Sequence, residues 1–216
     1  MSIIQNFLKI KNEIKILNDK TKLIIVTKNQ DINKIKKFLE CGHLDFGENR
    51  VQEAIDKWSI IIKNYKNLNL HMIGKLQSNK AKVAFNIFNY IHTLDSEKLA
   101  NIFSNLELAN EKKINYFIQV NIGNENQKSG VPISNLSEFT KYCKFDLKLN
   151  ILGLMCLPPI NESPDLYFKK LKDLSVDNKL NDLSMGMSND YKIAINLGAT
   201  YVRIGSFIFG KKSNQF

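Results

Sequence analysis

The sequence predicts an α/β fold, and within that class a single (β/α)8 TIM barrel with an extra N-terminal helix. Three observations lead to this prediction. The chain has 216 residues, enough for one domain with a full core. Eight short apolar runs have the composition of strands, and runs with helical spacing lie between them. Such alternation is typical of a parallel sheet, because parallel neighbours need crossover connections.

The expected strands are rich in β-branched and other apolar residues. They cover 23–28, 44–48, 69–74, 90–95, 115–122, 149–157, 182–188 and 201–205. Eight strands with crossover helices fit a chain of this length when the sheet closes into a barrel. An open, doubly wound sheet is the alternative, because a sequence does not show whether the first and last strands pair.

The expected helices carry apolar residues three and four positions apart. They cover 31–41, 50–65, 96–109, 132–145 and 190–197. Pro132 suits the first turn of one of them, and Gly198 is placed to end another. The segment 1–19 carries charges every few positions, so we expect an amphipathic helix on the outside or at one end of the barrel. We therefore expect a single domain over 1–216, with this helix over 1–19 and the barrel over 20–210.

The formal net charge of +10 raises the question of a nucleic-acid partner. Only two of the 31 basic residues are arginine, Arg50 and Arg203, and the lysines are spread along the chain. Nucleic-acid surfaces favour the bidentate fork of arginine, so we interpret the charge as solvated surface and expect no nucleic-acid partner. No apolar run reaches the length of about 18 residues that a membrane span requires. Since the N-terminal segment has no signal-peptide core, we expect a cytoplasmic protein.

The three cysteines lie far apart in the sequence and form no C-x-x-C pair. This spacing argues against a disulfide framework and against a structural zinc site. The three histidines, His43, His71 and His92, are scattered in the same way. We therefore expect no metal site.

Polar residues follow several of the expected strands at their carboxyl ends, where barrels place functional sites. Lys28 ends the first strand, Asn49 follows the second, and Met155 lies near the end of the sixth. Any one of them alone could be a loop residue or a helix cap. Lys28 stands out, because its alkyl stem is expected to run along a core strand before it delivers an ammonium group.

The ends of the last two expected strands suit an anion. In (β/α)8 proteins the loops after strands seven and eight commonly hold phosphate groups. The stretch SMGMS, 184–188, offers a glycine, hydroxyls that include Ser188, and the start of a helix. The stretch RIGS, 203–206, offers Gly205, which permits a close backbone approach, and Ser206 with a hydroxyl and an N–H. Together they predict a phosphate cradle.

Closure of the barrel would bring Lys28 and Arg203 near the same rim, because strands one and eight would then be neighbours about 4.8 Å apart. Arg203 and Gly205 share a parity, so both face the site if one does. A second cation beside an amine favours its neutral form, which attacks aldehydes. Pyridoxal 5'-phosphate (PLP) fits this set, with an aldehyde for the lysine, a phosphate for the cradle and a ring nitrogen for the arginine. The arginine keeps its proton and only donates a hydrogen bond.

Several long motifs of the chain resemble one family. They are VTKNQ, FGENRVQE, HMIGKLQSNK, IQVNI followed by KSG, GLM, and LSMGMSNDYKIAINLGATYVRIGSFIFG. In this order, from Leu23 to Gly210, they are similar to the YggS/PROSC family of pyridoxal phosphate homeostasis proteins. The resemblance implies the alanine-racemase-like barrel of that family, which is fold type III of the PLP-binding proteins.

The resemblance also implies roles for particular residues. Lys28 would hold this vitamin B6 cofactor covalently as a Schiff base, and Arg203 would face the ring nitrogen. The other implied cofactor-binding residues are Ser188, Gly205 and Ser206 for the phosphate, with Asn49 and Met155 along the ring.

Three functional hypotheses remain. The first is a PLP-binding protein that takes part in intracellular PLP homeostasis and delivery, without robust enzymatic turnover. The second is a PLP-dependent, racemase-like enzyme acting on amino acids, and the third is an aldolase-type barrel that uses Lys28 on a sugar phosphate. The first is favoured, because alanine racemases place a second acid–base group with an additional β domain and dimer contact, whereas only a short tail follows the eighth expected strand. PLP-requiring apo-enzymes are the expected recipients, and we expect a monomer.

Overall fold

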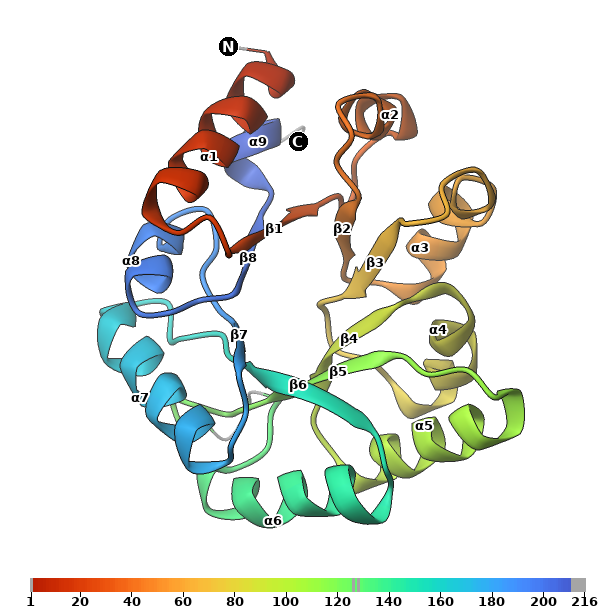
Figure 1. Ribbon diagram of the computed structural model, residues 1–216, viewed down its shortest axis with the longest axis vertical. Helices are drawn as coiled ribbons and strands as arrows, with labels where there is room; N and C mark the ends of the chain where they lie inside the picture. The colour runs from red at the N-terminus through yellow and green to blue at the C-terminus, as the bar shows by residue number, and fades with distance from the viewer. Residues whose placement is uncertain (1, 126, 128, 211–216) are drawn as a thin grey trace.

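The computed structural model describes residues 2–125, 127 and 129–210. Within this part of the chain, parallel strands pair in chain order, and β8 pairs with β1 to close the sheet. Helices surround the strands on the outside, as Figure 1 shows. The predicted (β/α)8 TIM barrel is confirmed, and the open doubly wound sheet is excluded.

Each strand lies within or next to its predicted range. The bounds are β1 Lys22–Val26, β2 Asp45–Glu48, β3 Asn69–Met72, β4 Tyr90–Leu94, β5 Asn115–Gln119, β6 Asn150–Met155, β7 Asp182–Ser184 and β8 Tyr201–Ile204. Most strands end before the predicted residue, because the chain leaves the ladder at the rim and turns outward to a helix. At the closure, Lys22 lies beside Tyr201 and Ile25 beside Ile204.

The helices alternate with the strands along the chain. Their bounds are α1 Ile3–Leu17, α2 Ile32–Glu40, α3 Val51–Trp58, α4 Ala81–Ile87, α5 Glu97–Asn110, α6 Leu136–Lys141, α7 Pro164–Asp177, α8 Tyr191–Asn196 and α9 Ser206–Phe209. The helix predicted over 50–65 ends early, and the one predicted over 132–145 begins with a 3-10 turn and ends in a π-helical turn. Helices α4 and α7 were not among the predicted ranges.

Side-chain caps fix where several helices begin. At α1, Ser2 accepts a hydrogen bond from the Gln5 backbone N–H, and the Gln5 side chain accepts one from the Ser2 N–H. Asp31 and Ser96 cap α2 and α5 through their side-chain oxygens. These contacts satisfy N–H groups that have no partner within the helix.

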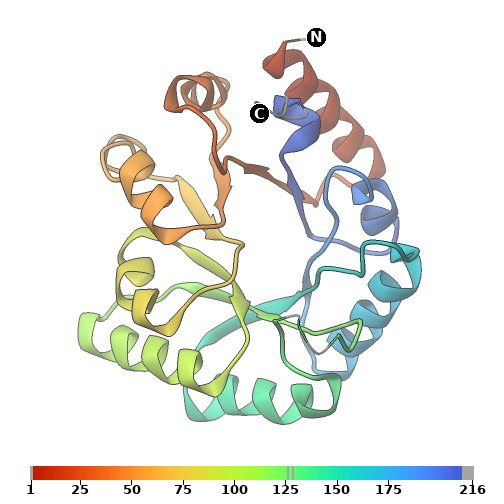
Figure 2. The same cartoon turned by 180° about the vertical axis from the view of Figure 1, so that it is seen from behind.

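The predicted N-terminal helix is confirmed as α1, which covers the outside of the barrel beside α8 and α9 (Figures 1 and 2). Its apolar face is buried, and from this face Phe7 meets Phe38 of α2 edge-on, with ring centroids 5.4 Å apart. The side-chain amide of Asn6 donates to the carbonyl oxygen of Ile208 in α9 at 3.1 Å. The first helix is therefore tied to the segment that follows the last strand.

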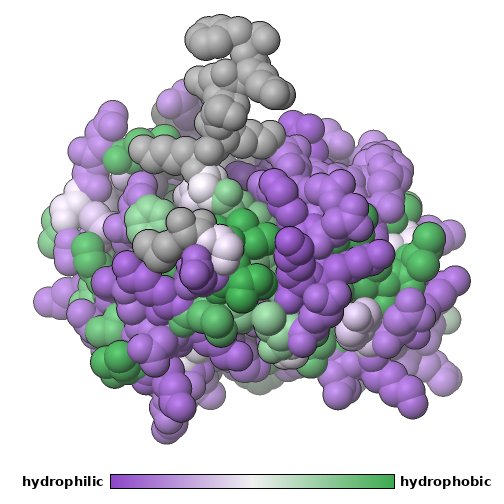
Figure 3. Space-filling view, turned by 90° about the horizontal axis from the view of Figure 1, so that it is seen from above, coloured by the Kyte–Doolittle hydropathy of each residue, from purple (hydrophilic) through white to green (hydrophobic). Residues whose placement is uncertain are grey.

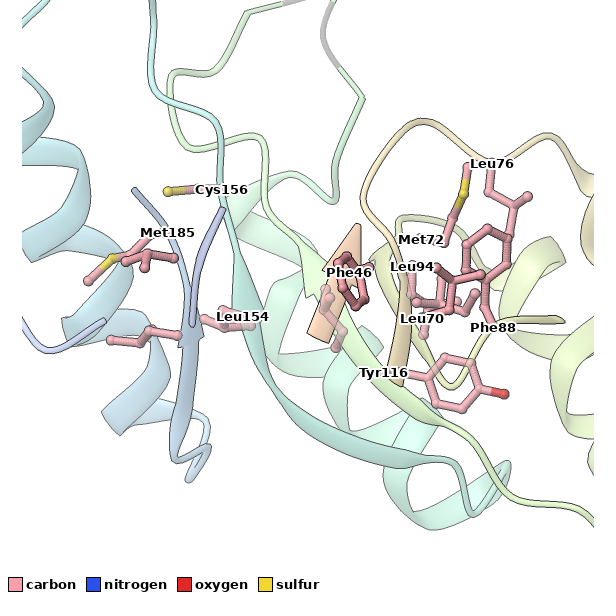
Figure 4. Close-up of a cluster of buried hydrophobic side chains, with 14 of the residues drawn as sticks. Phe46, Leu70, Met72, Leu76, Phe88, Leu94, Tyr116, Leu154, Cys156 and Met185 are labelled. Atoms are coloured by element: carbon pink, nitrogen blue, oxygen red, sulfur yellow. The ribbon is translucent and has the colours of Figure 1, made fainter. Parts of the chain in front are cut away.

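A large apolar cluster lies between the strands and the helices. Figure 4 shows part of it, with Leu154 and Met185 on one side of the barrel and Leu70, Phe88 and Tyr116 on another. Burial of apolar surface in this layer contributes about 25 cal/mol per Å² to folding, so it dominates the stability of the barrel.

A smaller cluster fills the barrel interior. Alternate residues of a barrel strand point to opposite sides of the sheet. In β1, Leu23 and Ile25 join the outer cluster, whereas Ile24 joins a separate one. The buried members of that inner cluster are Ile24, Phe117, Met155 and Tyr201.

Hydrophilic residues cover most of the face drawn in Figure 3, with hydrophobic residues in patches between them. Among the described helices, none combines the length and apolar character needed to cross a lipid bilayer.

Candidate functional site

Lys28 is exposed and lies two residues beyond the end of β1 at Val26. The expectation that its stem runs along a core strand is therefore corrected. At the end of the strand the Thr27 hydroxyl turns outward, toward helix α3, and donates to Glu48, and Asn29 then adopts a left-handed backbone with φ 56°. Lys28 therefore lies just past the carboxyl end of β1, at the rim of the barrel where this strand ends.

A buried polar network holds the peptide group before Lys28. One carboxylate oxygen of Glu48 accepts hydrogen bonds from the Thr27 hydroxyl at 2.6 Å and from the Trp58 indole at 3.0 Å. The Lys57 ammonium lies 2.8 Å from the same oxygen and donates to the Thr27 carbonyl oxygen at 2.6 Å. Side chains of strand β2 and helix α3 thus hold the end of β1 in place.

The peptide group after Lys28 is held by the same network. Glu53 accepts a hydrogen bond from the Asn29 backbone N–H and forms an ion pair with Lys57 at 2.8 Å. Burial raises the pKa of the Glu53 carboxyl, but the contacts with Lys57 and Asn29 outweigh this effect and lower the pKa overall. The backbone is therefore held on both sides of Lys28, whose side chain is exposed.

Arg203 is 3% exposed and lies in the barrel interior, beside Ile24 in the neighbouring strand. Its guanidinium donates to the Ser184 hydroxyl at 2.7 Å and to the Cys156 carbonyl oxygen at 3.0 Å. Within the described residues, no carboxylate forms an ion pair with it. An unpaired buried cation is costly for a protein, so this guanidinium is suited to an electron-rich ligand atom.

The loops after β7 and β8 meet beside Val26. A Cβ atom on Gly205 would lie 3.2 Å from both the Cβ and the carbonyl oxygen of Val26, so a larger residue would crowd Val26 here. In the described part of the chain, the backbone N–H groups of Gly205 and Ser206 form no hydrogen bond. Ser188 is buried next to them, and its hydroxyl accepts a hydrogen bond from the Phe207 N–H at 3.3 Å. The predicted anion cradle therefore has donors to offer.

Asn49 and Met155 lie at different depths. Asn49 is half-buried at the end of β2, and its side-chain oxygen is buried without a hydrogen-bond partner among the described residues. Met155 is fully buried in the inner cluster, below the mouth. A cavity of about 270 Å³ lies over the ends of β3 to β6; its lining includes Gly74, Gln119 and Asn121 but neither Asn49 nor Met155.

The sequence reasoning missed two groups of residues around this site. One is the pair Lys57 and Glu53 on α3, which hold the backbone of Lys28. The other is a line of polar side chains through the barrel interior, including His71 and His92. His71 and His92 could have been found from the sequence, because each is a polar residue within an otherwise apolar strand. In the described residues, no cluster of metal-ligating side chains occurs.

Comparison with known proteins gives first the class and then the family. Residues 2–213 match the family model described as alanine racemase, N-terminal domain, so the class is that of alanine-racemase-like barrels. The chain is 38% identical over 202 residues to the pyridoxal phosphate homeostasis protein of Aquifex aeolicus, covering 88% of this chain and 87% of the relative. It is 36% identical over 216 residues to that of Buchnera aphidicola subsp. Schizaphis graminum, with 95% and 92% covered. The chain belongs to the pyridoxal phosphate homeostasis protein family.

Solved structures agree with this assignment. PipY of Synechococcus elongatus, solved with PLP bound, has a TM-score of 0.88 and 29% identity, covering 97% of this chain and 100% of PipY. An alanine racemase of Clostridium difficile has a TM-score of 0.75 at 16% identity, covering 99% of this chain and 57% of the racemase. The second likeness is one of fold alone. The family relatives are named as homeostasis proteins and not as enzymes.

Proposed function

We propose that the protein binds PLP at the mouth of its barrel, holds it as a Schiff base on Lys28, and serves in PLP homeostasis and delivery without robust enzymatic turnover. One arrangement carries the proposal. An exposed amine and two backbone N–H groups without partners stand at the ends of neighbouring strands, above a buried guanidinium. These groups match the aldehyde, phosphate and ring nitrogen of PLP. The names of the relatives support the same cofactor.

The phosphate would lie against Ser188, Gly205 and Ser206. Their free N–H groups and hydroxyls are donors, and an anion is the partner that such donors lack. The absence of a Cβ at residue 205 lets this backbone pack closely on Val26, which supports the position proposed for these donors. At the other end, the guanidinium of Arg203 would donate to the ring nitrogen while keeping its own proton. PLP itself supplies an aldehyde that condenses with amines and a ring that withdraws electrons.

The ring would lie between Asn49 and Met155. The unpartnered side-chain oxygen of Asn49 suits a donor on the ligand, and the thioether of Met155 offers a polarizable, apolar contact. Lys28 would turn from solvent over the mouth, while the contacts of Lys57 and Glu53 keep its backbone in place.

The family names favour a carrier over the racemase-like alternative. Racemisation needs an acid–base group opposite the lysine. Of the described residues that line the cavity beside the mouth, Lys75 is the ionisable one, and it is exposed. The expected recipients are PLP-requiring apo-enzymes, and both the monomeric state and the cytoplasmic location stay predictions.

The first experiment locates the covalent bond. PLP is added to the purified protein, the absorbance is recorded, the mixture is reduced with borohydride, and the modified peptide is mapped. The adduct is expected on Lys28 and should be absent in Lys28→Ala. Lys36→Ala is the matched control, because Lys36 is an exposed lysine on α2. An adduct of equal yield on another lysine in Lys28→Ala would contradict the proposal.

A second experiment separates the carrier from the enzymes. The loaded protein is incubated with amino acids in deuterated water, and exchange of the α-proton is followed by NMR. No exchange above that of free PLP is expected. Exchange that depends on Lys28 would favour the racemase-like enzyme, and trapping of a sugar phosphate on Lys28 without PLP uptake would favour the aldolase.

A further inference from the structure

Five polar side chains form one continuous hydrogen-bonded chain through the barrel interior. The Arg203 guanidinium donates to the Ser184 hydroxyl at 2.7 Å, and this hydroxyl lies 2.7 Å from Nδ1 of His92. Nε2 of His92 lies 2.9 Å from Nδ1 of His71. Nε2 of His71 lies 3.2 Å from a carboxylate oxygen of Asp45. The chain thus connects the guanidinium below the mouth with a carboxylate at the start of β2.

The middle of this chain is sealed from solvent and held by aromatic rings. Ser184, His71 and His92 are fully buried. The His71 ring stacks on Tyr90 with centroids 4.3 Å apart, and the His92 ring stacks on Phe117 with centroids 4.4 Å apart. Stacking fixes both ring planes, so the imidazoles keep their nitrogens aligned with their neighbours.

The donor and acceptor roles follow from the two ends. A guanidinium only donates, so the Ser184 oxygen accepts from Arg203 and its own hydrogen is free to point at Nδ1 of His92. A neutral His92 then carries its hydrogen on Nε2 and donates to His71. His71 in turn carries its hydrogen on Nε2 and donates to Asp45. The opposite order would set a bare nitrogen of His71 against a carboxylate oxygen, with no hydrogen between them.

The charge states agree with this direction. Burial lowers the pKa of His71 and lowers that of His92 well below its usual value, so both imidazoles are neutral. Burial raises the pKa of the Asp45 carboxyl, but the hydrogen bond from His71 outweighs this and lowers it overall.

The other ionisable groups that face the chain do not interrupt it. They are Lys22, His43, Tyr90, Cys156, Asp182, Asp190 and Tyr201. His43 meets the backbone carbonyl oxygen of Asp45 at 2.8 Å and not its carboxylate. Burial raises the pKa of Tyr90, that of Tyr201 to about 12 and that of Cys156 to about 12, so these groups remain protonated. Lys22 donates to the Tyr201 phenol at 3.2 Å and not to a member of the chain.

We infer that Ser184, His92, His71 and Asp45 are positioning residues that orient Arg203 through a one-directional chain of hydrogen bonds. Each member donates a hydrogen bond to the next one in the direction of Asp45. The Ser184 hydroxyl, which accepts from the guanidinium, thus has its own hydrogen bonded to His92, and Arg203 can present its remaining N–H groups to a ligand. The inference rests on the proposed function only where it makes the PLP ring nitrogen the atom that Arg203 meets. The hydrogen-bond direction itself belongs to the ligand-free protein.

The direction is tested first without PLP. Side-chain nitrogen NMR of isotope-labelled protein is expected to show hydrogen on Nε2 and none on Nδ1 for both His71 and His92, unchanged between about pH 6 and 8. Hydrogen on Nδ1 of either ring, or a charged imidazolium, would overturn the inference. In Asp45→Asn the terminal amide can donate or accept, so both signals should shift. Asp182→Asn is the control, because it removes a charge from the same end of the barrel, and within the described residues no hydrogen bond or ion pair joins Asp182 to either ring.

The effect on Arg203 is tested by comparing PLP with its deaza analogue, in which a C–H group replaces the ring nitrogen. The native protein should prefer PLP about tenfold or more, because a hydrogen bond from a charged donor is lost with the analogue. In Ser184→Ala this preference should fall toward one, while Ser175→Ala, another buried serine, should keep it. An unchanged preference in Ser184→Ala would overturn the positioning role. If the native protein binds neither compound, the proposed function fails, whereas the NMR result still decides the direction of the chain.

Discussion

The side-chain nitrogen of Lys57 lies 2.6 Å from the carbonyl oxygen of Thr27 and 2.8 Å from a carboxylate oxygen of Glu48. One partly buried ammonium therefore joins helix α3 to the end of β1 and neutralises the carboxylate of Glu48, which is fully buried. Lys28, whose amine is proposed to hold PLP, directly follows Thr27 in the chain. Stability and cofactor binding should consequently respond together when this contact is broken.

We expect Lys57→Met to lower the free energy of unfolding by about 3–5 kcal/mol, because it leaves the Glu48 charge buried without its partner. Denaturant unfolding measures the change. The same variant should bind PLP more weakly, since the backbone around Lys28 loses its support. Lys36→Met on the exposed face of α2 should change stability by less than about 0.5 kcal/mol. Equal values for the two variants would show that the Lys57 contact is dispensable.

Gly205→Ala tests the anion cradle. The added Cβ would lie 3.2 Å from two atoms of Val26, closer than ordinary packing allows, while the backbone φ of −126° suits any residue. We expect a loss of stability of about 1–3 kcal/mol from overpacking. PLP affinity, measured by absorbance titration, should fall at least about tenfold, because roughly 1.4 kcal/mol of lost contact has that effect.

Ser206→Ala is the companion to that variant. It removes the hydroxyl but keeps the backbone N–H, so the loss of PLP affinity should be smaller than in Gly205→Ala. A larger loss in Ser206→Ala would mean that the hydroxyl and not the backbone holds the phosphate.

The positions of the strands could be predicted from the sequence, because buried parallel strands are short, nearly continuous apolar runs. The ends of the strands were harder to predict. The first strand ends where the Thr27 hydroxyl donates to Glu48 on the neighbouring strand, a contact that the local sequence does not reveal. Helix α4 was missed because a short helix packed on one face has little room for a periodic pattern.

The candidate site, like the fold, could be predicted from the sequence only in part. Lys28, Gly205 and Ser206 could be located as strand ends, since the order of the strands places them at one rim. The contact of His92 with Ser184 joins residues 92 positions apart, and it depends on both facing the barrel interior at the same height. That height is set by register and by the tilt of the strands, which local composition does not encode.

The histidines make stability depend on pH. Burial lowers the pKa of His43 from 6.5 to about 4, and it lowers the pKa of His71 and His92 as well. The unfolded chain therefore binds protons that the folded protein excludes, so this contribution is complete above about pH 6.5 and is lost as the pH falls toward 4.

We expect His43 to make the free energy of unfolding fall by about 1.4 kcal/mol per pH unit in this window, and His71 and His92 to add to the slope with the same sign. Denaturant unfolding at a series of pH values measures the slope. His43→Phe should reduce the slope by one proton, because phenylalanine does not titrate and the ring can still meet Phe7 and Phe46 edge-on. A slope unchanged by this substitution would mean that His43 is protonated in the folded protein.

The last prediction concerns helix α1. Phe7 is fully buried against Phe38 and His43, so Phe7→Ala should lower the free energy of unfolding by about 3–5 kcal/mol, as other large truncations in a core do. Leu8→Ala is the control on the same helix, since Leu8 is 52% exposed and its loss should cost less than about 0.5 kcal/mol.

The consequence for the site follows from where α1 packs. It lies against α9, whose first residue, Ser206, belongs to the proposed phosphate cradle. Phe7→Ala should therefore weaken PLP binding as well, measured by absorbance titration well below the unfolding midpoint. If PLP affinity is unchanged while stability falls as expected, helix α1 supports the fold without supporting the cradle.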